Sequence, residues 1–220
     1  MLSIVIPTLQ AAADLPAALA CLQGGNEIIV ADGGSADATG DIAAAVGARV
    51  IDAPRGRGAQ LAAGARQASG EWFLFLHADT VLASGWRQRV EEFMADPRNT
   101  GRAAVFRFAL DDGSPAARRL ERMVAWRTRA LGLPYGDQGL LISRAFYHEI
   151  GGFSPLPLME DVDMVRRIGR RRLTVLDAAA VTSAARFRRS GYLRRSLRNL
   201  FCLGLYFLGV PPWRIERIYR

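Results

Sequence analysis

The sequence predicts an α/β protein with a doubly wound, mostly parallel sheet and helices on both faces. Short apolar runs alternate with alanine-rich helical stretches through the first eighty residues, and glycine- and aspartate-containing turns follow several of those runs. Such alternation along a chain is typical of parallel sheets with right-handed crossovers. Half of the 220 residues are hydrophobic, so we expect one domain with one sizeable core.

The expected elements follow from these runs. Strands are predicted at 3–7, 27–32, 48–53, 71–79, 103–110, 139–143 and 173–177, and helices at 14–23, 36–46, 58–69, 86–96, 115–131 and 159–170. Asp14 should be the N-cap of the first helix, Pro16 should lie in its first turn, and Gly47 should end the second. Without an internal repeat or low-complexity linker, we divide the chain into a body at 1–185 and a basic, amphipathic helical extension of the same domain at 186–220.

Charge is distributed unevenly along the chain. All 29 basic residues are arginine; residues 166–220 hold 14 of them against two acids, whereas residues 1–165 hold 15 against 19. A basic segment of this kind implies an anionic partner, such as the phosphates of a lipid, a nucleotide or a nucleic acid. No apolar stretch reaches 18 residues and no basic region precedes an apolar one at the start, which argues against secretion and against a spanning helix. Cys21 and Cys202 are far apart and suggest a reduced cytosolic interior.

Two turns in the first half could bind anionic groups. After the second strand, VADGGSADAT places Asp32 before Gly33 and Gly34 at the start of a helix. The carboxylate could accept hydrogen bonds from a base or ribose, and a turn set by local geometry is an equally good interpretation. The stretch matches neither GxGxxG nor a P-loop. In RGRGAQ, Arg55 and Arg57 could hold a diphosphate, although that segment alone favours a flexible basic loop.

The run LFLHADT carries His77 and Asp79 at the end of the fourth strand. Side chains two apart share a face of a strand, so both should point the same way from its carboxyl end. That end is where ligands bind in open α/β sheets. Asp79, close to a diphosphate, suits Mg²⁺ or Mn²⁺, whereas His77 is a softer ligand and more often a packing residue. Taken alone, Asp79 is better explained as a turn or N-cap residue.

Two further polar stretches lie in the second half. MEDVDM places Glu160, Asp161 and Asp163 at the start of a helix, where three repelling carboxylates point to a cation or to a general base. The alternative is a helix N-terminus that favours acids through its dipole. YGDQG, with Asp137 and Gln138 between glycines, could line an acceptor pocket, although an ordinary turn explains it slightly better.

Taken together, SIVIPT, EIIVADGGSADAT, LFLHADT and MEDVDM, in this order, resemble the family 2 glycosyltransferases of GT-A fold. LHADT, YGDQG and the C-terminal WRIERIYR look most like the bacterial radical-SAM/selenodomain-associated transferases. The resemblance covers essentially the whole chain. It implies metal-assisted transfer of a sugar from a UDP-, GDP- or dTDP-linked donor to an acceptor hydroxyl, with inversion. The QxxRW motif of processive synthases is absent, which argues against a polymerase.

The resemblance also assigns roles. Asp32 matches the aspartate that contacts the base, and Asp161 matches the catalytic base of the ED motif. Asp79 matches the last aspartate of the metal-binding DXD motif, while His77 replaces the first. The implied nucleotide-sugar site comprises Pro7, Thr8, Asp32, Gly34, Arg57, Ala78 and Asp79. The implied acceptor site comprises Asp137, Gln138 and Glu160, and the implied ligands of Mg²⁺ or Mn²⁺ are Asp79 and His77.

The C-terminal stretch 186–210 combines clustered arginines with an apolar run at 200–210. Eleven residues cannot span a bilayer, but they could lie at its interface. Packing on the catalytic domain, or on a second subunit in a homodimer, is an equal alternative. We therefore expect a cytoplasmic protein, peripheral on the inner face of the plasma membrane, with a lipid-linked acceptor.

Two rival functions remain. A nucleotidyltransferase would also use a parallel sheet and metal carboxylates, but its GxGxR loop after the first strand is missing, because PTLQAAADL follows there. A nucleic-acid-binding protein could use the arginine-rich tail, although that reading leaves the acidic cluster at 160–163 without a purpose.

Overall fold

A computed structural model describes residues 1–219. It contains an eight-stranded sheet in the order β3-β2-β1-β4-β7-β6-β8-β5. The strands are β1 (Leu2–Thr8), β2 (Glu27–Asp32), β3 (Arg49–Asp52), β4 (Trp72–Phe75), β5 (Thr80–Leu82), β6 (Ala103–Leu110), β7 (Leu140–Ser143) and β8 (Leu173–Thr182).

Helices connect and flank these strands. The α-helices are α1 (Leu15–Leu22), α2 (Thr39–Ala45), α3 (Arg57–Gln67), α4 (Trp86–Ala95), α5 (Pro115–Leu131), α6 (Arg144–Glu149), α7 (Glu160–Ile168), α8 (Ala185–Ser190), α9 (Tyr192–Phe207) and α10 (Pro212–Tyr219). Short 3₁₀ turns occupy Pro97–Asn99, Gly136–Gln138 and Arg170–Arg172.

The sheet confirms the predicted fold class. Strands β1 to β4 pair in parallel, as expected from the alternation in the first eighty residues. The other half of the sheet is mixed: β7 runs antiparallel to both β4 and β6, β8 is parallel to β6, and β5 is antiparallel to β8. The carboxyl ends of β1, β2 and β4 therefore meet at one edge, where a ligand site is expected.

The predicted fourth strand, 71–79, is too long. Strand β4 ends at Phe75, and the chain then turns, with the amide of Thr80 donating to the carbonyl of His77 (3.2 Å). It continues as β5, which the sequence analysis did not predict and which pairs with the end of β8. His77 and Asp79 therefore lie in a turn and not on a strand face. Strand β8 runs to Thr182, five residues beyond its predicted end, because β5 and β6 both pair with that extra length.

The ends of the predicted helices shift by a few residues. Helix α2 begins at Thr39 and not at 36, because the preceding residues form a turn held by the Gln10 side chain, whose Oε1 accepts from the amides of Ala36 (2.9 Å) and Asp37 (3.1 Å). Asp14 occupies the N-cap position of α1, but its side chain makes no capping hydrogen bond.

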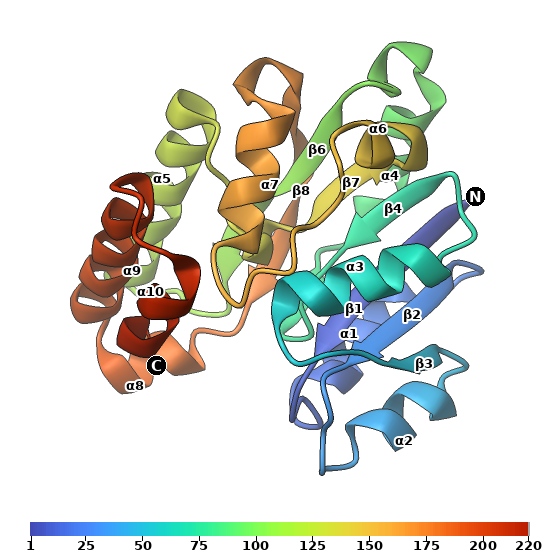
Figure 1. Ribbon diagram of the computed structural model, residues 1–220, viewed down its shortest axis with the longest axis horizontal. Coiled ribbons are helices and arrows are strands. Elements are labelled where there is room, and N and C mark those ends of the chain that lie inside the picture. Colours follow the sequence, from blue (N-terminus) through green and yellow to red (C-terminus); the bar gives the residue numbers. More distant parts are fainter. Residues whose placement is uncertain (220) are drawn as a thin grey trace.

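Helices lie on both faces of the sheet (Figure 1), and buried apolar side chains fill the space between them and the strands. One core packs β1 and β4 against α1 and α4 through residues such as Ile4, Leu19 and Phe93. The other packs the opposite face against α3, α6 and α7 and includes the fully buried Phe73. Because successive strand residues point to opposite faces, continuous apolar strands such as β1 fill both cores.

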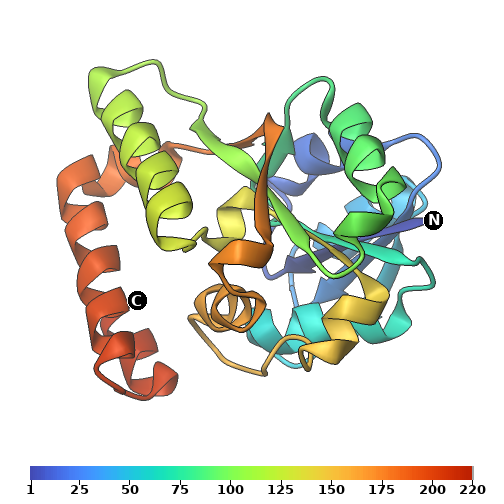
Figure 2. The ribbon, with the colours of Figure 1, turned by 90° about the horizontal axis from the view of Figure 1, so that it is seen from above.

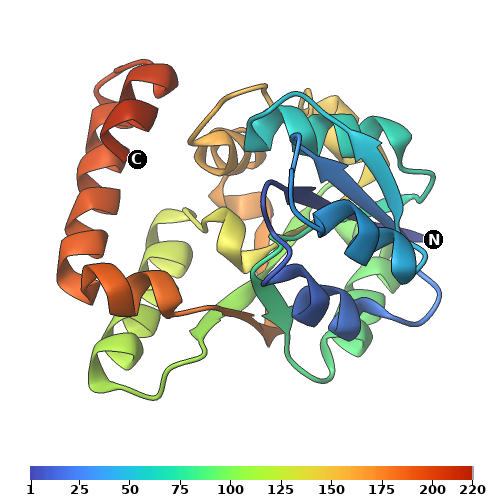
Figure 3. The same cartoon turned by 90° about the horizontal axis from the view of Figure 1, so that it is seen from below.

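The last three helices form an arm, residues 185–219, at one end of the molecule. Figures 2 and 3 show α9 standing apart from β1, β2 and β3 and next to α5. The arm packs through Cys202, Leu203 and Ile215 onto Leu158 and Val162, at the start of α7. Among residues 1–219, no helix is long and apolar enough to cross a bilayer.

Candidate active site

Two hollows meet at the edge where the parallel strands end. The first hollow, about 370 Å³, runs along the carboxyl ends of β1 and β4; it is lined by residues 7–11, Asp14, 55–57, Gln60, 77–79, Pro157, Arg186 and Glu216. The second hollow, about 120 Å³, lies between the start of α7, the turn at 135–137 and the arm. Arg57, His77, Asp79 and Arg186 line both hollows. We call these four residues the seam.

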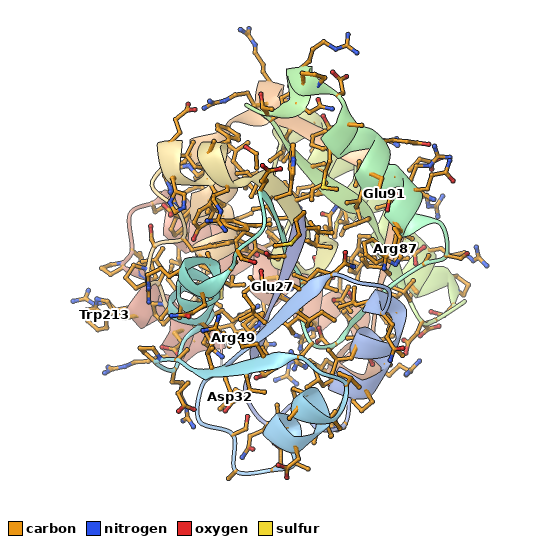
Figure 4. All side chains as sticks on the ribbon, turned by 90° about the vertical axis from the view of Figure 1, so that its right-hand side faces the viewer. Glu27, Asp32, Arg49, Arg87, Glu91 and Trp213 are labelled. Carbon is orange, nitrogen blue, oxygen red and sulfur yellow. The ribbon has the colours of Figure 1, made fainter. Side chains whose placement is uncertain are left out.

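Asp32 organises the turn after β2 (Figure 4). Its Oδ1 accepts from the hydroxyls of Thr8 (2.8 Å) and Ser35 (2.6 Å), and its Oδ2 accepts from the amides of Gly34 (3.0 Å) and Ser35 (2.7 Å). Burial opposes ionisation, but these hydrogen bonds outweigh it and lower the pKa of Asp32. Its acceptor positions are already used within the turn. Contact with a base stays a prediction for Asp32, and neither it nor Gly34 lines the first hollow.

Gln60 is a buried residue of the first hollow that sequence analysis missed. Its Nε2 donates to the carbonyls of Thr8 (2.6 Å) and Ala31 (2.9 Å), so one amide from α3 joins the ends of β1 and β2. Pro7, Thr8 and Ala78, all predicted for the nucleotide-sugar site, line the same hollow. A glutamine on a helix carries no sequence signal of such a role.

Arg57 begins α3 and forms an ion pair with buried Glu160 of α7, with 3.4 Å between Nε and Oε1. The carboxylate raises the pKa of Arg57. Burial raises the pKa of Glu160 to about 7, although Arg57 favours its charged form. The start of α3 also packs closely against the loop that precedes α7. A Cβ on Gly58 would lie 2.2 Å from the carbonyl oxygen of Ser154 in that loop. The RGRGAQ stretch is therefore a packed helix start and not a flexible loop.

His77 packs against the backbone of Gly136. A Cβ at position 136 would lie 2.5 Å from His77 Nε2, so only glycine admits the ring there. Burial, followed by the charge of Arg57, lowers the pKa of His77 to about 4. The imidazole is therefore neutral at pH 7, the form in which histidine binds metals.

Asp161 lines the second hollow and is held by two backbone amides. Its Oδ2 accepts from Gly136 (2.7 Å) and its Oδ1 accepts from Val162 (2.7 Å). Asp163 instead forms an ion pair with Arg167 (2.6 Å), on the side of α7 away from the hollow. Of the three carboxylates, Glu160 and Asp161 therefore lie at the site, and Asp163 has a structural role.

The two residues of the YGDQG turn also divide. Asp137 lines the second hollow, and burial raises its pKa to about 6 despite the nearby guanidinium of Arg127. Gln138 lies away from that hollow: its Oε1 accepts from the Thr128 hydroxyl (2.9 Å), and its Nε2 donates to the Phe106 carbonyl (2.9 Å). Of the two, the structure brings only Asp137 to the site.

The arm supplies site residues that the sequence analysis did not name individually. Phe187, Arg195, Asn199 and Tyr219 line the second hollow, and Arg186 joins the seam with its Nη1 3.9 Å from Asp79 Oδ2. Arg195 stacks over the Phe187 ring (5.1 Å). The clustered arginines were noticed in the sequence, but nothing in the sequence indicates which of them face the body.

A divalent cation fits the seam only with help from a ligand. Among residues 1–219, no group of three or more His, Cys, Asp or Glu side chains could hold a metal ion by itself. Asp79 and the neutral imidazole of His77 are two ligand side chains, too few to hold a divalent cation alone. Diphosphate oxygens commonly complete the coordination of Mg²⁺ beside one or two carboxylates, so the donor set suits a metal–diphosphate complex and does not suit a free metal site.

Comparisons with known proteins identify the family. Residues 3–156 match the family described as glycosyl transferase family 2. A PGL/p-HBAD biosynthesis glycosyltransferase of Mycobacterium bovis (strain BCG / Pasteur 1173P2) is 42% identical over 93 residues, and the corresponding protein of Mycobacterium tuberculosis (strain ATCC 25177 / H37Ra) is equally similar. The match covers 37% of this chain and 36% of the relative's length. The family match spans more than half of the chain, which therefore belongs to glycosyl transferase family 2.

Solved structures agree on the fold. Glucosyl-3-phosphoglycerate synthase from Mycobacterium tuberculosis, solved in complex with Mn²⁺, UDP and glucosyl-3-phosphoglycerate, superposes with a TM-score of 0.62 and 20% identity, covering 96% of this chain and 81% of that one. The structure of S. aureus TarS 1–349 superposes with a TM-score of 0.66 and 16% identity, covering 99% of this chain and 69% of that one. The chain thus has the GT-A fold expected from its sequence.

Proposed function

We propose that this protein transfers a sugar from a nucleotide-sugar donor to an acceptor hydroxyl. The observation that carries the proposal is the seam. It joins a first hollow at the ends of the parallel strands, suited to a nucleotide, to a second hollow that contains carboxylates. A donor with its nucleotide in the first hollow and its sugar in the second would have its diphosphate at the seam, beside Arg57 and Arg186.

The reaction needs few groups. Asp161, oriented by two amides, takes the proton of the acceptor hydroxyl. The acceptor oxygen bonds to the anomeric carbon from the side opposite the leaving group, and the bond from that carbon to the diphosphate oxygen breaks, which inverts the configuration. The negative charge that develops on the departing diphosphate is stabilised by Arg57 and Arg186.

Asp79 and His77 would hold a divalent cation together with the diphosphate oxygens. When bound, Mg²⁺ or Mn²⁺ would neutralise charge on the leaving diphosphate. The glucosyl-3-phosphoglycerate synthase with the same fold was solved with Mn²⁺ and UDP, which supports this cofactor class and a UDP-linked donor; GDP- and dTDP-linked donors stay in the test.

The acceptor side is proposed in two parts. Asp137 and Glu160 lie beside Asp161 and form, with the arm, the surroundings of the acceptor hydroxyl. We further propose a lipid-linked acceptor and a peripheral location on the inner face of the plasma membrane, supported by the exposed apolar and arginine-rich arm. Transfer of labelled sugar into an organic-phase extract would support this acceptor class, and label confined to water-soluble products would contradict it.

A donor screen tests the activity. Melting temperature and calorimetric binding are measured with UDP-, GDP- and dTDP-sugars, each with and without Mn²⁺. A true donor stabilises the folded protein by mass action. We expect metal-dependent stabilisation by one nucleotide, lost in Asp79→Ala and kept in Glu91→Ala, which changes an exposed acid on α4 (Figure 4) that lines neither hollow. Absence of any response to all three nucleotides would contradict the proposal.

A further inference from the structure

Helix α9 has two opposite faces. At about 100° per residue, Arg195 and Asn199 lie on one face, which forms a wall of the second hollow, and Cys202 is buried on the same side. The opposite face carries a continuous apolar series, here called the outer stripe: Leu193, Leu197, Leu200, Phe201 and Leu208. One helix therefore separates the site from whatever the outer stripe contacts.

The outer stripe is open to solvent. Its side chains are between 56% and 81% exposed, with Leu197 the least and Leu208 the most exposed. Leu197 follows Leu193 by four residues, Leu200 and Phe201 follow Leu197 by three and four, and Leu208, the C-cap residue, follows Phe201 by seven, so the five form one surface and not scattered exposures. Contiguous apolar surface of this kind marks an interaction site. On α10, Trp213 is also 50% exposed and lies near the outline of the molecule in Figure 4.

Charge around the outer stripe selects the partner. All three arm helices carry exposed arginines, among them Arg189, Arg194, Arg214 and Arg217. Glu216 is the one acid between residues 186 and 219. Two copies of this face would bring their arginines together and repel each other, so a second copy of the chain is a poor occupant. An anionic surface with an apolar interior satisfies both features.

Helix α5 contributes a second exposed apolar pair at the same end of the molecule. Met123 and Trp126 are 50% and 62% exposed on its outer side. They alternate with exposed arginines, among them Arg119 and Arg122. Helices α5 and α9 lie next to each other in Figures 1 and 3, and both carry exposed apolar side chains and arginines.

We propose that the outer stripe of α9 lies in the interface of an anionic lipid bilayer, with the surrounding arginines on the headgroups. The proposed docking is supported by the exposed apolar and arginine side chains of the arm and does not depend on the proposed function. Its consequence, that the acceptor hollow is held one helix thickness from the membrane, rests on the proposed glycosyltransferase function.

Vesicle binding tests the proposal with the full-length chain. Co-sedimentation is measured with phosphatidylcholine vesicles and with vesicles that also contain phosphatidylglycerol. We expect binding only to the anionic vesicles, weakened as NaCl is raised from about 0.1 to about 0.5 M, because salt screens the arginines. The double variant L197Q/L200Q should bind at least ~10-fold more weakly, since its lost apolar side chains anchor the helix. The matched control V46Q changes an apolar residue exposed on the opposite half and should bind like the wild type.

Two readouts separate this proposal from its alternatives. Donor binding is measured on the same preparations, so a protein that binds nucleotide but no vesicles would overturn the docking and the proposed membrane location, and would leave the proposed sugar transfer standing. Light scattering gives the oligomeric state. A dimer that L197Q/L200Q dissociates, without vesicle binding by the wild type, would assign the stripe to a second copy. Equal vesicle binding by L197Q/L200Q and the wild type would also overturn the proposal.

Discussion

The two hollows that meet at the seam differ in how completely their polar groups are bonded. Next to the first hollow, the Asp32 carboxylate accepts four hydrogen bonds, and Gln60 ties together the ends of two strands. Around the second, Asp137 Oδ1, Asn199 Oδ1 and Arg195 Nε are buried and without hydrogen-bond partners within the described part of the chain.

This difference indicates that the first hollow is already organised for its ligand, whereas the second is not. An unsatisfied buried polar group costs about 1–3 kcal/mol, and a ligand or rearrangement that satisfies it recovers part of that cost. The pKa values follow the same division, because hydrogen bonds lower that of Asp32 and burial raises those of Asp137 and Glu160. The following variants test this division.

The largest effect is expected for Asp161→Asn. The variant keeps the shape of the side chain and removes its ability to take a proton, so kcat should fall about 10²- to 10⁴-fold. Nucleotide binding should be unchanged, because the nucleotide occupies the other hollow. Initial rates and calorimetric titrations on one preparation measure both. Glu91→Gln is the matched control, and an Asp161→Asn enzyme of normal kcat would exclude Asp161 as the base.

A stability comparison of two glycines comes next. Gly58→Ala places a Cβ 2.2 Å from the carbonyl oxygen of Ser154, whereas Gly40→Ala on α2 meets nothing within 4 Å. Overpacking should cost Gly58→Ala about 1–3 kcal/mol of unfolding free energy or more, while Gly40→Ala should gain about 0.4–1 kcal/mol. Urea unfolding measures both. Equal stabilities would mean that α3 is not held against the 154–156 loop.

Asp137→Asn should stabilise the protein, and the gain should depend on pH. Burial raises the pKa of Asp137 to about 6 from 3.8, so the folded state holds a proton between these values that the unfolded state has lost. Wild-type stability therefore falls as pH rises from about 4 to about 6, and the variant lacks this fall. Above pH 6 the variant should be more stable by about 3 kcal/mol, the free-energy equivalent of raising the pKa from 3.8 to about 6. Melting curves of both proteins over a pH series measure this difference. A variant less stable than the wild type at pH 8 would contradict the raised pKa of Asp137.

Asp32→Asn should change the stability of the protein in the opposite direction to Asp137→Asn and make it less stable. The lowered pKa of Asp32 contributes stability that is present above the unfolded-state pKa and is lost as pH falls through the folded-state pKa. The variant should be less stable than the wild type at pH 7, and the difference should shrink in acid. Melting curves from pH 7 to about pH 3 measure it. A gap that is constant across this range would mean that the carboxylate charge does not organise the turn.

Local patterns in the sequence were sufficient for the first half of the fold. Strands β1 to β4 and the helices between them follow alternation and turn residues that lie close along the chain. Strand β5 was not predicted because its three residues become a strand by pairing with Thr182 and its neighbours, about a hundred residues away.

The same limit applies to the site. Motifs identified the seam residues Arg57, His77 and Asp79, which the structure brings together, although His77 and Asp79 meet in a turn. Gln60, Arg195 and Asn199 escaped detection, because their roles depend on how α3 and the arm pack against the sheet. Conversely, the Gln138 side chain turns toward α5 and away from the hollow, which the turn-like sequence around it does not reveal.

A crystal structure with the nucleoside diphosphate from the donor screen and Mn²⁺ tests the central claim most directly. The account predicts the nucleotide along Pro7 and Thr8, the diphosphate beside Asp79, Arg57 and Arg186, and the second hollow open to the acceptor next to Asp161. A nucleotide bound elsewhere, or a diphosphate with no contact to the seam, would contradict it.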